Sequence, residues 1–376
     1  MEIVALATLF LALLAALFLT PLVRVAAIKI GFIDRPGERK IHAQDIAYGG
    51  GVAVALAMLL AMTLIFMQTW RPIEKDPDDP PPLTLICISA GAAGAMLLGL
   101  VDDKYKLSPL TKLGGQVVLA ALAMAGGVRI TAFIGDTVVM KCVTVCWIVL
   151  ITNSFNLLDN MDGLCAGTVA IASGMLALVS LDSGQTALVI GLAALCGACL
   201  GFLRYNRAPA SIFLGDAGSL FVGYCMACLT AVVTYYRQSK PSHLAIGIPV
   251  LILAIPLYDT LSVILIRLKE RRPIMRGDNS HFSHRLVDLG MNRRQAVTTI
   301  HLACLAIGLP ATILGQLSEK SGLLIIGQAF LVLTIVALLE RAGRFRALHP
   351  QNKSAWEAPA ISQDQNKVAA NAEKRL

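Results

Sequence analysis

The polar stretch NSFNLLDNMDGL follows directly on the apolar segment VMKCVTVCWIVLIT. Its amides and carboxylates recur at intervals of three, which predicts one helical face; they are Asn153, Asn156, Asp159 and Asp162. Ionisable groups at the edge of a membrane are costly to place there and are usually functional. The stretch therefore predicts a polar ledge beside hydrocarbon, and a capped helix turn that ends at Gly163 is the weaker alternative.

A pair of adjacent carboxylates, Asp102 and Asp103, ends another apolar run and precedes Lys104. Adjacent carboxylates repel each other, which raises the pKa of one of them or recruits a cation. Either result suits proton transfer or metal binding. The alternative is a helix-end pair solvated among lipid headgroups.

Two further motifs, FLGDAGSLFVG and HFSH, place chemistry-bearing residues beside apolar runs. Asp216 lies in the first, among glycines and at the start of a helix whose free N–H groups would attract anions, although a plain helix cap has the same pattern. His281 and His284 in the second, beside Arg285, suggest phosphate or metal binding. An exposed basic loop would look similar.

These motifs together offer hard oxygen ligands for Mg²⁺, with Mn²⁺ as an alternative ion. The nine cysteines lie within apolar runs with no histidine beside their CxxC pairs, so we expect neither zinc nor a disulfide framework. Oxygen ligands and cations for phosphates point to phosphoryl transfer, in which positioning and charge neutralisation do most of the work. We expect a lipid co-substrate because the site opens at the edge of a bilayer.

The elements that must position these motifs are membrane helices. The chain has 376 residues, 56% hydrophobic and 15% charged, against about 25% charged in soluble domains. A spanning helix needs about 20 mostly apolar residues, and about eleven such runs occur: 3–27, 48–68, 83–101, 113–131, 138–155, 163–181, 185–203, 212–235, 245–266, 296–317 and 322–340. The predicted fold class is an all-α polytopic bundle, with the first run as a span rather than a signal peptide.

Most basic residues lie in the first, third, seventh and ninth connections and in the tail, which predicts that this face is cytoplasmic. The N-terminus is then outside and the C-terminus inside, in a cytoplasmic (inner) membrane. The net charge of +8 is mostly this topology signal, so we expect no nucleic-acid partner. We predict a transmembrane domain at 1–342 and a polar, disordered cytoplasmic tail at 343–376.

Four motifs in this order, VDDKYKLSP, NSFNLLDNMDGL, GFLRYN with FLGDAGSLFVG, and GDNSHFSHRLVDLG, resemble the polyprenyl-phosphate N-acetylhexosamine-1-phosphate transferases over about residues 1–340. The HxxH-R-L-x-D-x-G arrangement with the following NRRQAV is similar to the branch that makes undecaprenyl-pyrophosphoryl-GlcNAc. The resemblance implies an Mg²⁺-dependent attack of a polyprenyl phosphate on the β-phosphorus of a UDP-N-acetylhexosamine, with release of UMP, in cell-wall or surface-polysaccharide synthesis.

The same resemblance implies a role for each motif residue. Asp216 would bind Mg²⁺ directly, and Asp102 and Asp103 would engage or deprotonate the lipid phosphate, with Lys112 nearby to neutralise charge. The remaining residues would bind the nucleotide, order the metal or contact the phosphates: Asn156, Asp159, Asp162, His281, His284 and Arg285. Asp259, within an apolar run, would bond inside the bundle.

The chain departs from the family pattern at three places. Asn160 stands where many relatives have Gly, Ser283 replaces a histidine, and the first loop has AQDIAYGGG in place of a version with Pro and Arg. Two alternatives remain: a phospho-MurNAc-pentapeptide transferase and, from another class, a membrane transporter with carboxylates at the midplane.

Overall fold

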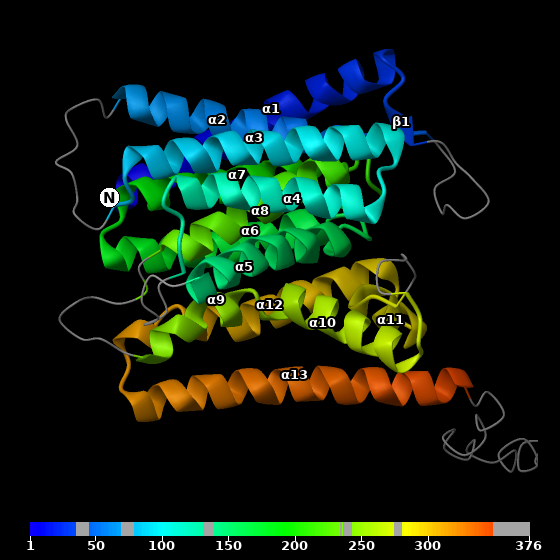
Figure 1. The fold of residues 1–376 in the computed structure, drawn as a ribbon. Coiled ribbons are helices and arrows are strands. Elements are labelled where there is room, and N and C mark those ends of the chain that lie inside the picture. Colours follow the sequence, from blue (N-terminus) through cyan, green and yellow to red (C-terminus); the bar gives the residue numbers. More distant parts are fainter. Residues whose placement is uncertain are drawn as a thin grey trace, which may run out of the picture.

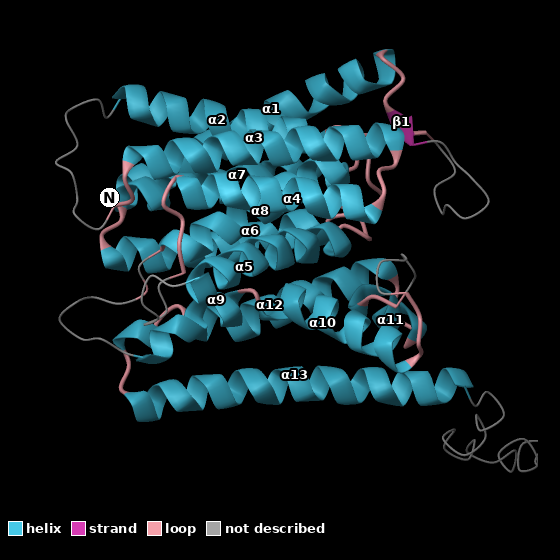
Figure 2. Ribbon diagram, viewed as in Figure 1, coloured by secondary structure: helices cyan, strands magenta, loops and turns pink. Residues whose placement is uncertain are grey.

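The computed structural model describes residues 1–34, 45–68, 79–130, 138–233, 235, 243–273 and 280–348. The described chain is almost entirely helical, with one two-residue strand pair at one end (Figures 1 and 2). The elements are α1 Glu2–Lys29, β1 Ile33–Asp34, β2 Ile46–Ala47, α2 Gly50–Gln68, α3 Pro82–Tyr105, α4 Pro109–Ala125, α5 Val138–Leu158, α6 Leu164–Ser183, α7 Thr186–Asn206, α8 Gly215–Val232, η1 His243–Ile246, α9 Gly247–Ile252, α10 Ala254–Lys269, α11 Phe282–Asp288, α12 Arg293–Ala311, η2 Leu314–Gln316 and α13 Glu319–Leu348.

Helices that could cross a membrane make up most of the described residues. Within the described ranges, nine helices are long and apolar enough to cross a membrane. A tenth span is possible if Leu244–Ile252 and Ala254–Lys269 count as one. Those two segments meet at a bend of 73°, and α4 is a shorter apolar helix. Each of the eleven predicted runs contains helix, which confirms an all-α polytopic membrane protein, although run 245–266 is broken and α4 is shorter than a full span.

The helices at the centre of the bundle are buried, and the outer helices expose apolar side chains. The apolar windows of α6, α7 and α8 are 78%, 72% and 83% buried, whereas that of α13 is only 11% buried. Figure 1 shows α13 along one side of the bundle, beneath α10 and α12. Because lipid tails are as apolar as leucine, an exposed apolar face needs no protein partner in a bilayer.

Close backbone packing brings the start of α8 against α3. A Cβ atom on Gly99 of α3 would lie 2.2 Å from the carbonyl oxygen of Asp216 and 2.4 Å from the amide nitrogen of Ala217. Only a glycine therefore lets the two helices approach this closely. The packing matters for function because it fixes the turn of α8 that carries Asp216.

Replacing Gly99 by alanine is expected to lower the free energy of unfolding by about 1–3 kcal/mol, because the added methyl group must push α3 and α8 apart. Thermal unfolding of the detergent-purified protein measures this loss. The control is Gly114→Ala in α4, where a Cβ would meet nothing within 4 Å and alanine favours the helix. Equal unfolding temperatures for Gly99→Ala and wild type would contradict the packing argument.

The ends of the helices that carry the four motifs lie together. The strand pair, the α3–α4 connection and α11 all sit at the right-hand end of Figure 1, opposite the N-terminus. Helix α13 continues through Leu348, so the first residues of the predicted tail, 343–348, are helical. The rest of the predicted tail lies outside the described residues. So do parts of the connections that the topology prediction uses, at 35–44, 69–78, 236–242 and 274–279.

Candidate functional site

A polar cavity of about 860 Å³ opens at this end of the bundle. Six of the predicted site residues line it: Asp103, Asn156, Asp159, Asp162, Asp216 and His284. Asn160 and three basic residues, Lys106, Arg293 and Arg294, line it as well. The cavity is large enough for a nucleotide-sized ligand, since small-molecule sites usually measure about 300–1,000 Å³.

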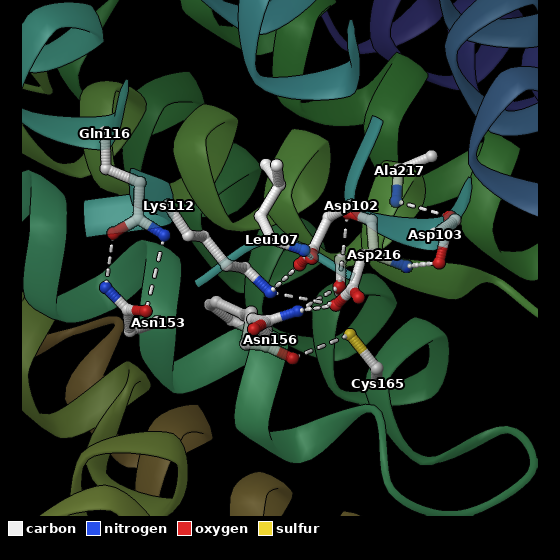
Figure 3. Close-up of polar contacts among 12 residues, drawn as sticks. Asp102, Asp103, Leu107, Lys112, Gln116, Asn153, Asn156, Cys165, Asp216 and Ala217 are labelled. Carbon is white, nitrogen blue, oxygen red and sulfur yellow. Dashed lines mark hydrogen bonds and ion pairs between the residues drawn. The ribbon is translucent and has the colours of Figure 1, made fainter. Parts of the chain in front are cut away.

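The N-terminus of α8 is capped by a carboxylate from another helix. Leu214 precedes α8 and offers no side-chain cap. Asp103 of α3 takes that place: the N–H groups of Asp216 and Ala217 donate to its two oxygens at 2.9 and 3.1 Å (Figure 3). Gly215 has a φ of +73°, and a Cβ there would lie 2.8 Å from the Asp103 carboxylate. The cap therefore requires glycine and places the side chain of Asp216 at the cavity.

Lys112 of α4 joins the two acidic motifs. Its Nζ lies 2.7 Å from Oδ2 of Asp102 and 3.1 Å from Oδ1 of Asp216 (Figure 3). The other oxygen of Asp102 accepts the N–H of Leu107 at 2.8 Å. Neither Asp102 nor Lys112 belongs to the cavity lining. Lys112 thus neutralises the charge of Asp216 and positions its side chain, and Asp102 holds Lys112; both lie outside the cavity.

The last turns of α5 supply two amides with different partners. Asn156 donates through Nδ2 to Oδ1 of Asp216 at 2.5 Å and to Oγ of Ser219 at 2.8 Å. Asn153 instead exchanges hydrogen bonds with Gln116 of α4 and is absent from the cavity lining (Figure 3). Of the four residues of the predicted polar ledge, Asn156, Asp159 and Asp162 line the cavity, whereas Asn153 does not.

The prediction of one continuous helical face through Asp162 is wrong, because α5 ends at Leu158. Gly163, with a φ of +77°, begins the next helix after a turn. Its N–H donates to Oδ1 of Asn206 at 3.0 Å, and Oδ2 of Asp162 accepts the N–H of Ala210 at 3.0 Å. These two bonds hold the 159–163 turn against the end of α7 and the connection that follows it.

Asp159 lies in this turn, beyond the end of α5. Burial raises the pKa of its carboxyl well above the ordinary value, and the negative charges of Asp216 and Asp103 raise it further. Like charges so close together are costly unless a cation or a proton relieves them. Asp159 and Asp216 are therefore the carboxylates best placed to share a cation at the cavity.

His281 precedes α11 and is buried. Its Nδ1 lies 3.0 Å from Oδ2 of Asp259, and the other oxygen of Asp259 accepts the N–H of Phe282 at 2.5 Å. His281 does not line the cavity. Asp259 thus holds the start of α11 to α10, in accord with the bonding role that the family resemblance implies.

Arg285 is placed differently from the prediction of a substrate-binding residue. Its side chain is 5% exposed, and its guanidinium forms an ion pair of 3.0 Å with Glu340 of α13. It also donates to Oγ of Ser262 at 2.8 Å and to the carbonyl of Ser280. Tyr258 donates to the second oxygen of Glu340 at 2.8 Å. The charge of Arg285 is matched inside the protein, so this residue joins α11 to α10 and α13.

His284, one residue before Arg285, does face the cavity. Burial lowers the pKa of its imidazole, and the electrostatic influence of His281 and Arg293 lowers it further. The ring is therefore neutral at neutral pH and can serve as a hydrogen-bonding group without a charge.

Several cavity residues were missed by the motif analysis. Tyr48 after β2 packs against Phe32 and Phe213, with ring centroids 5.6 and 6.1 Å apart. Arg293 opens α12, behind the cap that Asn292 forms with Gln295. The sequence does carry a signal for the second, because N-R-R-Q has the spacing of a capping box with basic residues in the first turn.

Comparisons with known proteins identify the family. The family model described as glycosyl transferase family 4 matches residues 85–234. The chain is 32% identical to a probable undecaprenyl-phosphate N-acetylglucosaminyl 1-phosphate transferase of Bacillus subtilis, over 86% of this chain and 89% of the relative. It is 31% identical to a decaprenyl-phosphate N-acetylglucosaminephosphotransferase of Mycolicibacterium smegmatis, over 86% of each chain. An undecaprenyl-phosphate alpha-N-acetylglucosaminyl 1-phosphate transferase of Thermotoga maritima is 30% identical over 71% of this chain and 77% of its own. This multi-pass membrane protein therefore belongs to glycosyl transferase family 4, among the polyprenyl-phosphate N-acetylglucosamine-1-phosphate transferases.

Proposed function

We propose that the protein transfers N-acetylglucosamine-1-phosphate from UDP-GlcNAc to a polyprenyl phosphate. An oxygen of the lipid phosphate attacks the β-phosphorus of the donor, and a new P–O–P bond forms to the lipid. The bond from the β-phosphorus to the bridging oxygen breaks, and that oxygen leaves with UMP. The products are polyprenyl-pyrophosphoryl-GlcNAc and UMP, which would enter the synthesis of a cell-wall or surface polysaccharide.

The observation that carries this proposal is the acidic cavity at the ends of membrane-length helices. Its carboxylates come from β1, from α3, from the turn after α5 and from α8, so soluble and lipid-bound phosphates can meet there. The names of the three relatives all specify a polyprenyl phosphate and N-acetylglucosamine. The donor nucleotide follows from the resemblance of the motifs.

The donor set fits Mg²⁺. Asp159 and Asp216 offer hard oxygen atoms. Burial raises the pKa of Asp159, the nearby negative charges raise it further, and a divalent cation would relieve that repulsion. No set of three His, Cys, Asp or Glu side chains within the described ranges could hold a metal ion. Mg²⁺ is usually bound through one or two carboxylates together with waters and substrate phosphates, so Asp159 and Asp216 would be enough to hold it. When bound, the ion would neutralise charge on the donor diphosphate.

The chain's own residues would position the reactants. Of the adjacent carboxylates only Asp103 lines the cavity, so we assign the contact with the lipid phosphate to Asp103 and the anchoring of Lys112 to Asp102. Lys112 and Asn156 hold Asp216 by the contacts described above. His284 is placed to contact the donor phosphates as a neutral hydrogen-bond donor, and Asp162 fixes the turn that carries Asp159.

We assign the cavity to the cytoplasmic side of the membrane. The α3–α4, α7–α8 and α10–α12 connections carry many of the chain's basic residues and lie at the cavity end of the bundle (Figure 1). Positive residues are enriched in cytoplasmic loops, and the nucleotide donor is a cytoplasmic metabolite. The N-terminus, at the opposite end of α1, would then face outward.

Release of UMP is the direct test. Detergent-purified protein with a C55 polyprenyl phosphate, Mg²⁺ and UDP-GlcNAc is expected to release UMP at least tenfold faster than with UDP-MurNAc-pentapeptide or UDP-glucose, because the donor hexose must fit the cavity. Reactions without lipid or without protein are the controls. If no UDP-sugar gives UMP, the proposal is wrong; if the pentapeptide donor is fastest, the assignment of the donor is wrong.

A further inference from the structure

A buried carboxylate near the end of α13 connects this outer helix to the helices beside the cavity. Glu340 is only 5% exposed, although the apolar window of α13 is just 11% buried. Its two oxygens have different partners: Nη2 of Arg285 lies 3.0 Å from Oε1, and the hydroxyl group of Tyr258 donates to Oε2 at 2.8 Å. Glu340 therefore contacts α10 and α11 at once, at the end of the bundle where α11 lies (Figure 1).

The guanidinium of Arg285 carries this contact onward to the start of α11. Its Nη1 donates to the carbonyl of Ser280, and its Nη2 donates to Oγ of Ser262 at 2.8 Å. Ser280 directly precedes His281, the N-cap residue of α11. Because a guanidinium is planar and its donors have a fixed geometry, a carboxylate that fixes one donor also fixes the direction of the others.

Helix α11 depends on such attachments for its position. It spans only seven residues, Phe282–Asp288, and a helix this short is not stable alone in water. His284 lines the cavity, whereas its neighbour Arg285 does not. Since the two residues lie on one short helix, a displacement of Arg285 would also displace the imidazole of His284.

Stability alone is a poor explanation for this buried ion pair. Replacing both partners of a buried pair by apolar side chains is often neutral or even stabilising, and what such pairs can provide is a specific conformation. An apolar helix in a bilayer needs no charge to remain beside its neighbours. Ionisable residues within membrane helices are rare and usually functional, so the place of Glu340 favours a role in positioning.

We propose that Glu340 is a positioning residue for the cavity: through Arg285 it holds α11 so that His284 faces the reacting phosphates. Glu340 does not line the cavity, so it contacts no substrate in this role. The inference rests on the proposed transferase function, in which His284 contacts the donor phosphates.

A double-mutant cycle in UMP release tests the connection. We expect kcat to fall about tenfold in Glu340→Ala and about tenfold to a hundredfold in His284→Ala, the usual range for a hydrogen bond to a charged group, with KM for the donor within about threefold. The double variant should be no slower than His284→Ala alone, because Glu340 acts through His284. A residue with a merely structural role would instead lower kcat by the same factor in both backgrounds.

Thermal unfolding in detergent separates positioning from stability. Glu340→Ala leaves Arg285 buried without its carboxylate and should lower the unfolding temperature by about 5–10 °C. Replacing both partners by methionine, in Arg285→Met with Glu340→Met, should return the unfolding temperature to within a few degrees of wild type, while kcat stays about tenfold low. Recovery of both quantities in this double variant would overturn the inference.

Two further variants bracket the effect. Glu340→Gln keeps an oxygen that can accept from Arg285 and should lose less than about threefold in kcat. Glu319→Ala is the matched control, because Glu319 is an exposed carboxylate at the other end of α13 and should leave both kcat and the unfolding temperature unchanged. If Glu340→Ala does not fold, Glu340→Gln and the methionine pair take its place in the same cycle with His284→Ala.

The outcomes distinguish this inference from the proposed function. A wild-type protein that releases no UMP from any UDP-sugar overturns both. An active wild type in which the loss of Glu340 lowers kcat equally with and without His284 overturns only the positioning role. The same holds if Glu340→Ala keeps the wild-type kcat.

Discussion

Asp216→Asn is expected to reduce kcat by about a thousandfold or more while the protein remains folded. Asparagine keeps the size of the side chain and one oxygen that can accept from Asn156, but it removes the negative charge that would bind Mg²⁺. Loss of about 4 kcal/mol of charge stabilisation in the transition state corresponds to this factor. The backbone N–H of residue 216 would still donate to Asp103, so α8 keeps its cap.

UMP release measured across a range of Mg²⁺ concentrations tests this expectation. Chelation with EDTA should abolish wild-type turnover, and added Mg²⁺ should restore it in wild type but not in Asp216→Asn. Asp288→Asn is the matched control, because Asp288 is an exposed carboxylate of α11 that does not line the cavity. Near-normal turnover of Asp216→Asn, or wild-type turnover in EDTA, would remove the proposed metal role.

The helices of this fold were predictable because a membrane span is a local signal. About 20 apolar residues suffice to indicate one, and the eleven runs all became helix. The bend after Leu253 was missed, since hydropathy counts residues and says nothing of direction. The sequence does contain a signal for this bend, because Pro256 lies in the first turn of α10. A proline has no N–H to donate to the preceding turn, so it favours the start of a new helix over the continuation of the old one.

The site was only partly predictable, for a different reason. Residue type and spacing brought out the carboxylates that gather at the cavity. They gave no sign that Asp103 caps α8 or that Arg285 pairs with Glu340, because the partners lie 113 and 55 residues away in the chain. A buried arginine and a phosphate-binding arginine look alike in sequence. What separates them is whether the fold supplies a carboxylate, and that is a property of tertiary packing.

The network around Asp259 yields the second large effect, this time on stability. Asp259→Ala is expected to lower the free energy of unfolding by about 3–5 kcal/mol, the usual result of removing one partner from a buried ionic cluster. The side chain is 1% exposed and accepts from His281 and from the N–H of Phe282, with Nη2 of Arg285 4.0 Å away. Without it, α11 loses its attachment to α10, and His284 loses its fixed place at the cavity.

Thermal unfolding in detergent, combined with UMP release, separates this anchoring role from a direct catalytic one. Asp259→Asn keeps an oxygen for the N–H of Phe282 and should be less destabilised than the alanine variant. Thr260 is the neighbour of Asp259 in α10. Thr260→Ala removes a neutral buried hydrogen bond of 2.9 Å to Ser154 of α5 and should cost only about 1 kcal/mol. If Asp259→Ala unfolds at the wild-type temperature yet loses all turnover, Asp259 acts in the chemistry itself. If stability and turnover fall together, and fall less in Asp259→Asn, its function is to hold α11 in place.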